Sequence, residues 1–293
     1  MIPASEPSCD DEEAGFHAAL IGLGRRGCEC VRRLRRSGLA DACAFLIDHD
    51  PESRQEEAPP ERTCWIGNVE TVPDFSACGL LGVVIVGAEH RDKTEQLSFK
   101  LGLLKERPTL LLGIVLPPPA GEQIRLKPEL LGELDGVAFW PDDPGRPESW
   151  ALLQAAVADL VDVVFVPGPV EADLAELITV FGGARSVLIA SATQECPAAP
   201  ERMMAMAYTA LATLNDRGFK PDRATGMLVV ARGGDGAGVE ACEGVRRLFR
   251  DILPDAATVA LAAPAGEDWR ERTRVSLFAV GPFDGVEAGF DTR

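Results

Sequence analysis

The stretch IGLGRRG at Ile21–Gly27 follows the apolar run His17–Leu20 and decides how the first half of the chain folds. Gly22, Gly24 and Gly27 have the G-x-G-x-x-G spacing of a turn between a strand and a helix. In such a turn, glycines let the backbone approach a phosphate group closely. The stretch therefore predicts a β-strand, a nucleotide-type turn and an α-helix, in that order.

Two arginines, Arg25 and Arg26, occupy the middle of this turn. A guanidinium group binds phosphate well, so the arginines could neutralise a bound nucleotide. They could also fill the pocket and replace the nucleotide. The sequence leaves both interpretations open, and the function of the protein depends on which of them holds.

Segments typical of strands and of helices alternate through the first half of the chain. Nearly continuous apolar runs predict parallel strands buried on both faces, at His17–Ile21, Cys43–Ile47, Leu81–Val86, Thr109–Val115 and Val137–Trp140. Helices are predicted at Gly27–Ser37, Asp92–Lys105 and Pro128–Gly132, and a surface loop at Pro51–Arg62. This alternation predicts an α/β fold with a doubly wound, mainly parallel sheet.

The second half has a different pattern. An apolar-periodic stretch from Trp150 to about Val166 predicts a buried central helix, which the prolines of Pro167–Pro169 end. A smaller α+β region follows, with helices predicted at Val170–Phe181, Pro200–Arg217 and Gly238–Asp251, and strands at Ser186–Ser191, Gly226–Ala231, Thr258–Ala263 and Arg274–Val280. We therefore expect a disordered acidic arm (1–16), a Rossmann-like domain (17–146), a central helix (147–169), an α+β domain (170–283) and a short tail (284–293).

The composition excludes several classes of protein. The 293 residues carry a formal net charge of −17, which argues against binding to nucleic acid or to an anionic membrane. The eight cysteines form no CxxC motif and there are only three histidines, so we expect no metal site and small, buried thiols. No apolar run is long enough to span a bilayer and no secretory leader is seen, so a cytoplasmic protein is expected.

Several motifs, taken in order, resemble the FtsZ/tubulin family of filament-forming GTPases over roughly Ala18–Gly281. Val166–Leu177 resembles the family's loop PGLINLDFADV and the helix after it. Gly226–Gly234 is similar to the family's GVLVNITGG, and Arg274–Gly281 to its VRVTVIATG. The order and spacing of these matches make the resemblance specific, and they imply the fold of that family.

Two segments of the first half resemble the nucleotide-binding parts of the family. Gly22–Val31 is similar to its first phosphate loop, GVGGGGGNAV, and Phe45–Asp50 to its strand that ends in INTD. The resemblance implies GTP or GDP as the cofactor, unless the site has lost its nucleotide altogether. It implies nucleotide-binding roles for Gly22, Gly24, Arg25, Arg26, Gly27, Asp48, Gly87 and Asp143.

In this family, the loop after the central helix enters the nucleotide site of the next subunit, where its carboxylates polarise the attacking water. Asp173 matches the first carboxylate, Glu176 replaces the second, and Glu171 stands where the family has an asparagine. The resemblance thus implies Asp173 and Glu176 as catalytic residues that act on a neighbouring subunit. Both also have a structural interpretation, since acidic residues at a helix start complement the helix dipole. Asp142-Asp143, placed like the family's base-binding ND pair, is equally typical of a simple turn.

The chain departs from the family at its signature loop. GGGTGTG should follow the strand Val83–Val86, but the chain reads GAEHRDKT at Gly87–Thr94. Glu89 brings negative charge toward the phosphates, and Arg91 and Lys93 compensate by charge alone. We therefore predict a cytoskeletal or cell-division-related protein, at most a weak GTPase. It would act by assembling with itself or another FtsZ-like protein, or by binding a partner, without direct binding to membranes or nucleic acid.

An alternative function is that of an NAD(P)-dependent oxidoreductase. The glycine spacing fits, and Asp48 or Asp50 lies a little more than twenty residues beyond Gly24, where a ribose-binding carboxylate is expected. Against it, the second half offers no constellation of His, Lys or Tyr for hydride transfer.

Overall fold

The computed structural model describes residues 18–39, 42–47, 63–66, 81–87, 110–118, 132–183, 186–234 and 238–283. Several predictions fall outside these residues: the acidic arm, Asp48, the loop residues 88–94, the helix at 92–105, most of the helix at 128–132, and the tail.

Ten strands form one sheet. In chain order they are β1 (Ala18–Leu23), β2 (Cys43–Ile47), β3 (Thr63–Ile66), β4 (Leu81–Val86), β5 (Leu110–Val115), β6 (Gly136–Phe139), β7 (Val187–Gln194), β8 (Gly226–Arg232), β9 (Thr258–Ala262) and β10 (Thr273–Val280). Their order across the sheet is β3-β2-β1-β4-β5-β6-β7-β10-β8-β9. The first six strands are parallel to one another, which confirms the predicted doubly wound sheet.

The strand order reverses between β1 and β4, because β2 and β3 lie on one side of β1 and the later strands on the other. In open α/β sheets, ligands bind in the crevice outside the carboxyl ends of the strands at such a switch point. The edge strand β3 was not predicted, since four residues after a charged loop make too short an apolar run.

The C-terminal half of the sheet is mixed. β10 runs antiparallel to both of its neighbours, β7 and β8, while β8 and β9 are parallel. β6 joins β7 through one residue pair, Ala138 and Val187. The residues of β10 are buried along the whole strand, which explains why its sequence alternates only loosely.

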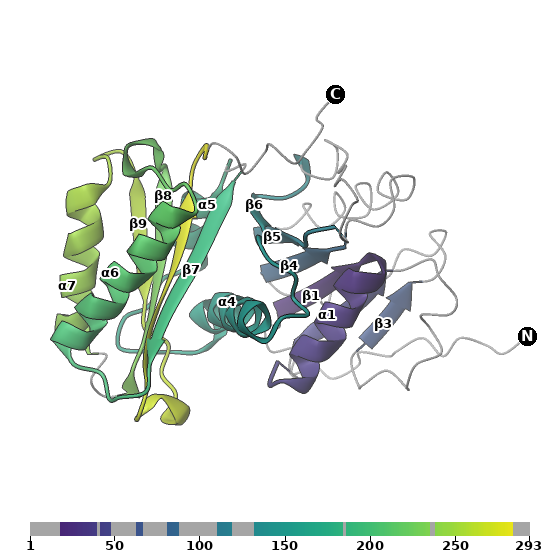
Figure 1. Cartoon of the computed structure of the whole chain (residues 1–293), viewed down its shortest axis with the longest axis horizontal. Helices are drawn as coiled ribbons and strands as arrows, with labels where there is room; N and C mark the ends of the chain where they lie inside the picture. Colours follow the sequence, from purple (N-terminus) through teal and green to yellow (C-terminus); the bar gives the residue numbers. More distant parts are fainter. Residues whose placement is uncertain are drawn as a thin grey trace, which may run out of the picture.

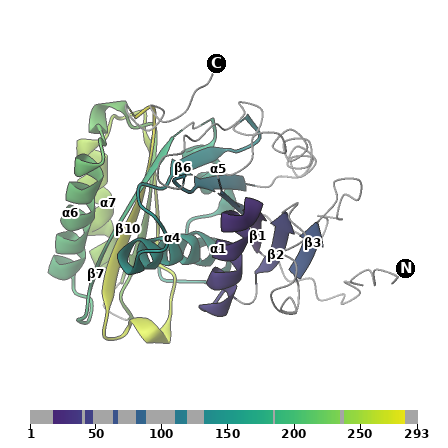
Figure 2. The ribbon, with the colours of Figure 1, turned by 45° about the vertical axis from the view of Figure 1, so that its right-hand side comes forward.

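Five helices and two short 3-10 turns complete the described fold: α1 (Gly24–Arg36), α4 (Pro147–Phe165), α5 (Leu174–Phe181), α6 (Pro200–Asp216), α7 (Val239–Ile252), η4 (Pro221–Arg223) and η6 (Glu267–Trp269). α6 and α7 lie side by side on the outer face of the C-terminal half of the sheet (Figures 1 and 2). α1 begins at Gly24, three residues earlier than predicted. The positive φ of Gly24, 69°, turns the chain from β1 directly into the helix, so Arg25 and Arg26 belong to a helical turn and not to a loop.

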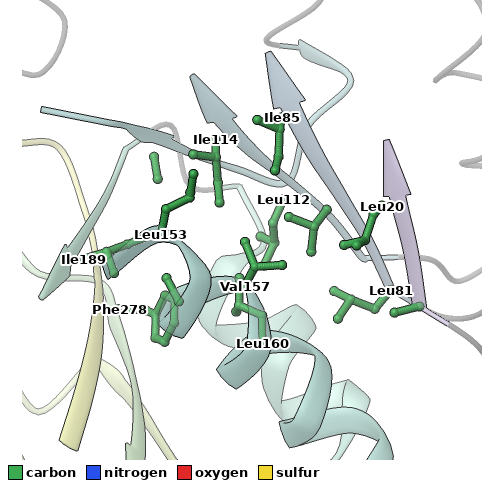
Figure 3. Close-up of a cluster of buried hydrophobic side chains, with 14 of the residues drawn as sticks. Leu20, Leu81, Ile85, Leu112, Ile114, Leu153, Val157, Leu160, Ile189 and Phe278 are labelled. Atoms are coloured by element: carbon green, nitrogen blue, oxygen red, sulfur yellow. The ribbon is translucent and has the colours of Figure 1, made fainter. Parts of the chain in front are cut away.

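The central helix α4 lies between the two halves of the sheet (Figures 1 and 2). Figure 3 shows Leu153, Val157 and Leu160 of α4 among side chains of the sheet, with Leu112 from the N-terminal half and Phe278 from the C-terminal half. All five are almost completely buried. Burial of one such side chain stabilises the fold by about 1.5–3 kcal/mol, so α4 joins the halves through one common core.

Candidate functional site

Three glycines, Gly22, Gly27 and Gly87, meet at the carboxyl ends of β1 and β4. A Cβ atom on Gly22 would lie 2.8 Å from Cα of Cys28, and one on Gly27 would lie 2.3 Å from the carbonyl oxygen of Ile85. Gly87 donates its N–H to the carbonyl of Leu23 (2.9 Å), and a Cβ there would lie 3.1 Å from the nitrogen of Gly27. The glycine spacing therefore brings α1 unusually close to β4, and each glycine is needed for this close packing whether or not a phosphate is bound.

The side chain of Arg26 extends over these strand ends. Its guanidinium donates through Nη1 to the carbonyl oxygen of Pro117, just after β5, and through Nη2 to Oδ1 of Asp143 (3.1 Å), just after β6. The Arg26 side chain is 19% exposed, against 62% for Asp143. Arg26 thus links the start of α1 to the ends of two other strands, at the switch point where ligands bind in open α/β sheets.

Arg25 has a different environment from its neighbour. Its side chain is 61% exposed, and its Nε lies 3.3 Å from a carboxylate oxygen of Glu29 one turn later in α1. The first turn of α1 contains no acidic residue, and Leu23 at the N-cap offers no side-chain acceptor. The partial positive charge of the helix N-terminus and the two arginines therefore gather at one place, which favours a negatively charged neighbour.

Asp143 also shapes the turn that leads into α4. Its Oδ1 accepts a second hydrogen bond from the backbone N–H of Gly145 (3.0 Å), which is the geometry of an Asx turn. Ser149 follows in α4 and donates to the carbonyl oxygen of Asp142 (3.3 Å). Asp143 therefore stabilises the turn and binds the Arg26 side chain. Its predicted contact with a nucleotide base stays a prediction.

The two predicted catalytic carboxylates lie at the start of α5. Asp173 is the N-cap of this helix, and its Oδ1 accepts a hydrogen bond from the backbone N–H of Glu176 (2.7 Å). Glu171, Asp173 and Glu176 are all exposed. Asp173 thus stabilises the helix, as the structural interpretation held, while a catalytic role for Asp173 and Glu176 stays a prediction.

Replacement of Asp173 tests its structural role as the N-cap of α5. Asp173→Ala removes the N-cap and should lower the free energy of unfolding by about 1 kcal/mol, while Asp173→Asn should keep stability because asparagine caps equally well. Urea unfolding of both variants gives the comparison. If Asp173→Asn instead loses as much stability as Asp173→Ala, the carboxylate charge matters and the cap does not.

The crevice and these carboxylates lie at opposite ends of α4. The helix has 19 residues and is therefore about 28 Å long. Asp143 lies just before its first residue, Pro147, whereas Val170, beyond its last residue, pairs with Ala263 at the end of β9. Asp173 and Glu176 therefore follow the end of α4 that lies away from Arg26 and Asp143 of the same chain.

A buried network of charges joins the second half of α4 to the C-terminal sheet. Asp159 of α4 is completely buried. Its Oδ1 accepts hydrogen bonds from Arg232 of β8 and Arg274 of β10, and its Oδ2 accepts one from Ser276, each at 2.5 Å. Arg232 also donates to Asp162 one turn later in α4, again at 2.5 Å. Two carboxylates are thereby matched by two guanidinium groups inside the protein.

Trp269 of η6 covers this network. Its ring lies 4.4 Å from the guanidinium carbon of Arg274 and 5.3 Å from that of Arg232, within the range of cation–π attraction. Burial raises the pKa of Asp162 and lowers that of Arg274. The pKa of Arg232 is raised, because the nearby charges of Asp159 and Asp162 outweigh the opposing effect of its burial.

The sequence analysis did not identify this network. The available signal was Asp159, a charged residue on the apolar face of a predicted buried helix, since buried charges require partners. Which arginines supply those partners depends on the fold, because they are 73 and 115 residues away along the chain.

Other functional groups are scarce in the described part of the chain. No cluster of His, Cys, Asp or Glu suited to a metal ion occurs among those residues. Burial raises the pKa of the Cys30 and Cys242 thiols to about 11, so both stay protonated and behave as small apolar side chains. None of the described helices is long and apolar enough to cross a membrane.

No family model and no curated protein sequence matches this chain. Solved structures do. FtsZ of M. jannaschii, as a tryptophan-to-tyrosine mutant, superposes with a TM-score of 0.73 at 18% identity, over 91% of this chain and 91% of that one. CetZ2 of Haloferax volcanii, a GTPγS-bound protofilament, gives 0.64 at 16% identity, over 94% and 96%. TubZ of Bacillus thuringiensis serovar israelensis, in GDP-form protofilaments, gives 0.57 at 12%, over 92% and 84%.

These likenesses extend over both halves of the chain and include α4 between them. The parallel sheet, the central helix and the mixed C-terminal half, present here in one continuous arrangement, therefore establish that this chain has the FtsZ/tubulin fold.

Proposed function

We propose that this chain is a tubulin-like assembly protein whose nucleotide crevice is closed by its own Arg26. Its subunits would associate end to end with further copies, or with another protein of this fold, without GTP hydrolysis. The neighbours of similar fold have been solved as a dimer in one case and as protofilaments in others, which supports assembly as the general function.

The position of Arg26 carries the proposal. The guanidinium group lies where a nucleotide would enter the switch-point crevice, and it is held there by the Pro117 carbonyl and by Asp143. A phosphate-binding arginine would instead direct its donors into the space left for the phosphates. The contact with Asp143 also offsets the charge of the Arg26 guanidinium, so that this group attracts a nucleotide less strongly.

The cost of displacing Arg26 sets the size of the effect. A hydrogen bond from a charged group contributes about 1.5–3 kcal/mol, and a partly exposed ion pair up to about 1 kcal/mol. Displacement therefore costs about 2–3 kcal/mol, or about 100-fold in the dissociation constant.

Calorimetric titration of nucleotide-free protein with GDP and GTP tests this assignment. The wild type should bind about 100-fold more weakly than Arg26→Ala, because the alanine variant opens the crevice. Arg25→Ala is the matched control, since that side chain projects into solvent beside Glu29, and it should behave as the wild type does. Tight binding by the wild type that Arg26→Ala weakens would make Arg26 a phosphate ligand and refute the proposal.

The same titration with NAD⁺ and NADP⁺ addresses the oxidoreductase alternative. The strand order β3-β2-β1-β4-β5-β6 and the glycine turn are common to dinucleotide-binding sheets, so the alternative has these features in its favour. Binding of a nicotinamide cofactor in preference to GTP would support it over assembly.

A further inference from the structure

We propose that the buried network of Asp159, Arg232, Arg274 and Trp269 positions the loop 166–173 for contact with a second copy of this chain. This inference rests on the end-to-end assembly proposed above. In this proposal, four residues outside the crevice hold the loop at the opposite end of the subunit in the conformation that contacts the second copy.

The loop starts directly beyond the network. Val166, four residues after Asp162, donates its N–H to the Asp162 carbonyl (2.8 Å) and ends α4. From there the loop is seated on the segment after β9, because Ala263 donates to the carbonyl of Val170 (2.8 Å) and Ala265 to that of Pro167 (3.1 Å). The loop that carries Glu171 and Asp173 is therefore held between the end of α4 and the segment after β9.

The chemistry of the network suits positioning better than stabilisation. Buried ion pairs are on balance no more stabilising than apolar side chains of similar size, but they impose a defined geometry. Asp159 and Asp162 lie three residues apart on one face of α4, and the single guanidinium of Arg232 binds both. This arrangement adds a directional constraint on the rotation of α4 about its own axis to the one that its buried apolar face imposes.

Trp269 connects the network to the segment after β9 that binds the loop, which contains Ala263 and Ala265. It follows Ala263 and Ala265 on the same connection between β9 and β10, and its ring lies over Arg274 and Arg232. The backbone around it is closely packed, since a Cβ on Gly234 would lie 3.0 Å from Cα of Arg270. The Trp269 ring therefore contacts the two guanidinium groups and belongs to the same β9–β10 connection as Ala263 and Ala265, which bind the loop.

Hydrogen exchange and assembly, measured on the full chain, test the inference together. The first variant is Trp269→Ala, with Trp269→Phe as the conservative partner that keeps an aromatic ring over the arginines. The second is the quadruple substitution D159L/D162N/R232M/R274M, which removes two carboxylates and two guanidinium groups together and should leave the fold stable. Exchange is read at the amides of Ala263 and Ala265, assembly as the critical concentration in sedimentation, and stability as the melting temperature.

We expect both Trp269→Ala and the quadruple variant to speed exchange at these two amides about tenfold and to raise the critical concentration about fivefold. Trp269→Phe should restore both quantities, and melting temperatures should stay close to that of the wild type. Unchanged exchange at the two amides overturns the inference. So does faster exchange throughout the protein with a lower melting temperature, which would make the network purely structural. A wild type that never assembles refutes the proposed function instead, and the exchange data still decide the positioning role.

Discussion

Replacement of Asp159 by asparagine is expected to lower the free energy of unfolding by about 3–5 kcal/mol. The substitution keeps the shape of the side chain but removes the negative charge that two buried guanidinium groups share. Arg232 and Arg274 are then left partly uncompensated in the interior, where an unpaired charge is costly. A loss of this size is a large part of the 5–15 kcal/mol by which domains are usually stable. Urea unfolding followed by circular dichroism measures it directly.

Asp162→Asn is the matched control for this experiment. Asp162 is 28% exposed and, among the described residues, its carboxylate pairs with Arg232 alone, so its replacement should cost less than about 1.5 kcal/mol. Burial raises the pKa of Asp162, so the native state holds a proton there more tightly than the unfolded chain does. Its charged form therefore costs stability at neutral pH, and this cost is lost as the pH falls through the raised pKa. Equal losses for Asp159→Asn and Asp162→Asn would show that burial of the shared charge is not the dominant effect.

Gly27→Ala is the substitution near the crevice with the largest expected effect, a loss of about 3 kcal/mol. The added Cβ would lie 2.3 Å from the backbone oxygen of Ile85, and a backbone atom in a central strand cannot rotate away. α1 must then separate from β4, which also disturbs the contact between Arg26 and the strand ends. Urea unfolding gives the magnitude.

Gly244→Ala serves as the opposite case in the same chain. Gly244 lies inside α7, and a Cβ there would meet only the end of Met204 at 3.5 Å, an ordinary contact. This variant should gain about 0.5–1 kcal/mol, because alanine suits a helix interior better than glycine. If Gly27→Ala is also neutral or stabilising, the close packing of α1 on β4 is not a constraint on the glycine turn.

The sequence predicted the main elements well where the signal is local. The apolar runs of β4 and β5 are long and continuous, and their predicted bounds agree with the structure to within one residue. The edge strand β3 and the start of α1 at Gly24 were missed, because four residues give little periodicity and a glycine-rich turn does not look helical. The division into domains at residues 146 and 169 stays a prediction, and one core that includes α4 packs against both halves.

The candidate site was predictable only in part. The spacing of Gly22, Gly24 and Gly27 located the turn, since close backbone approach requires glycine at fixed intervals. The choice for Arg26, between a phosphate ligand and a side chain that closes the crevice, was open in the sequence. It depends on the Pro117 carbonyl and Asp143, which are 91 and 117 residues away.

The sequence by itself therefore determined the doubly wound sheet, the central helix and the glycine turn, because apolar periodicity and backbone freedom are properties of short segments. Only the tertiary structure decided where the long arginine side chains end. A guanidinium group can reach in many directions, and its partners are fixed by which carbonyl and carboxylate groups the whole fold brings within its reach. This holds for Arg26 above the crevice and for Arg232 and Arg274 around Asp159.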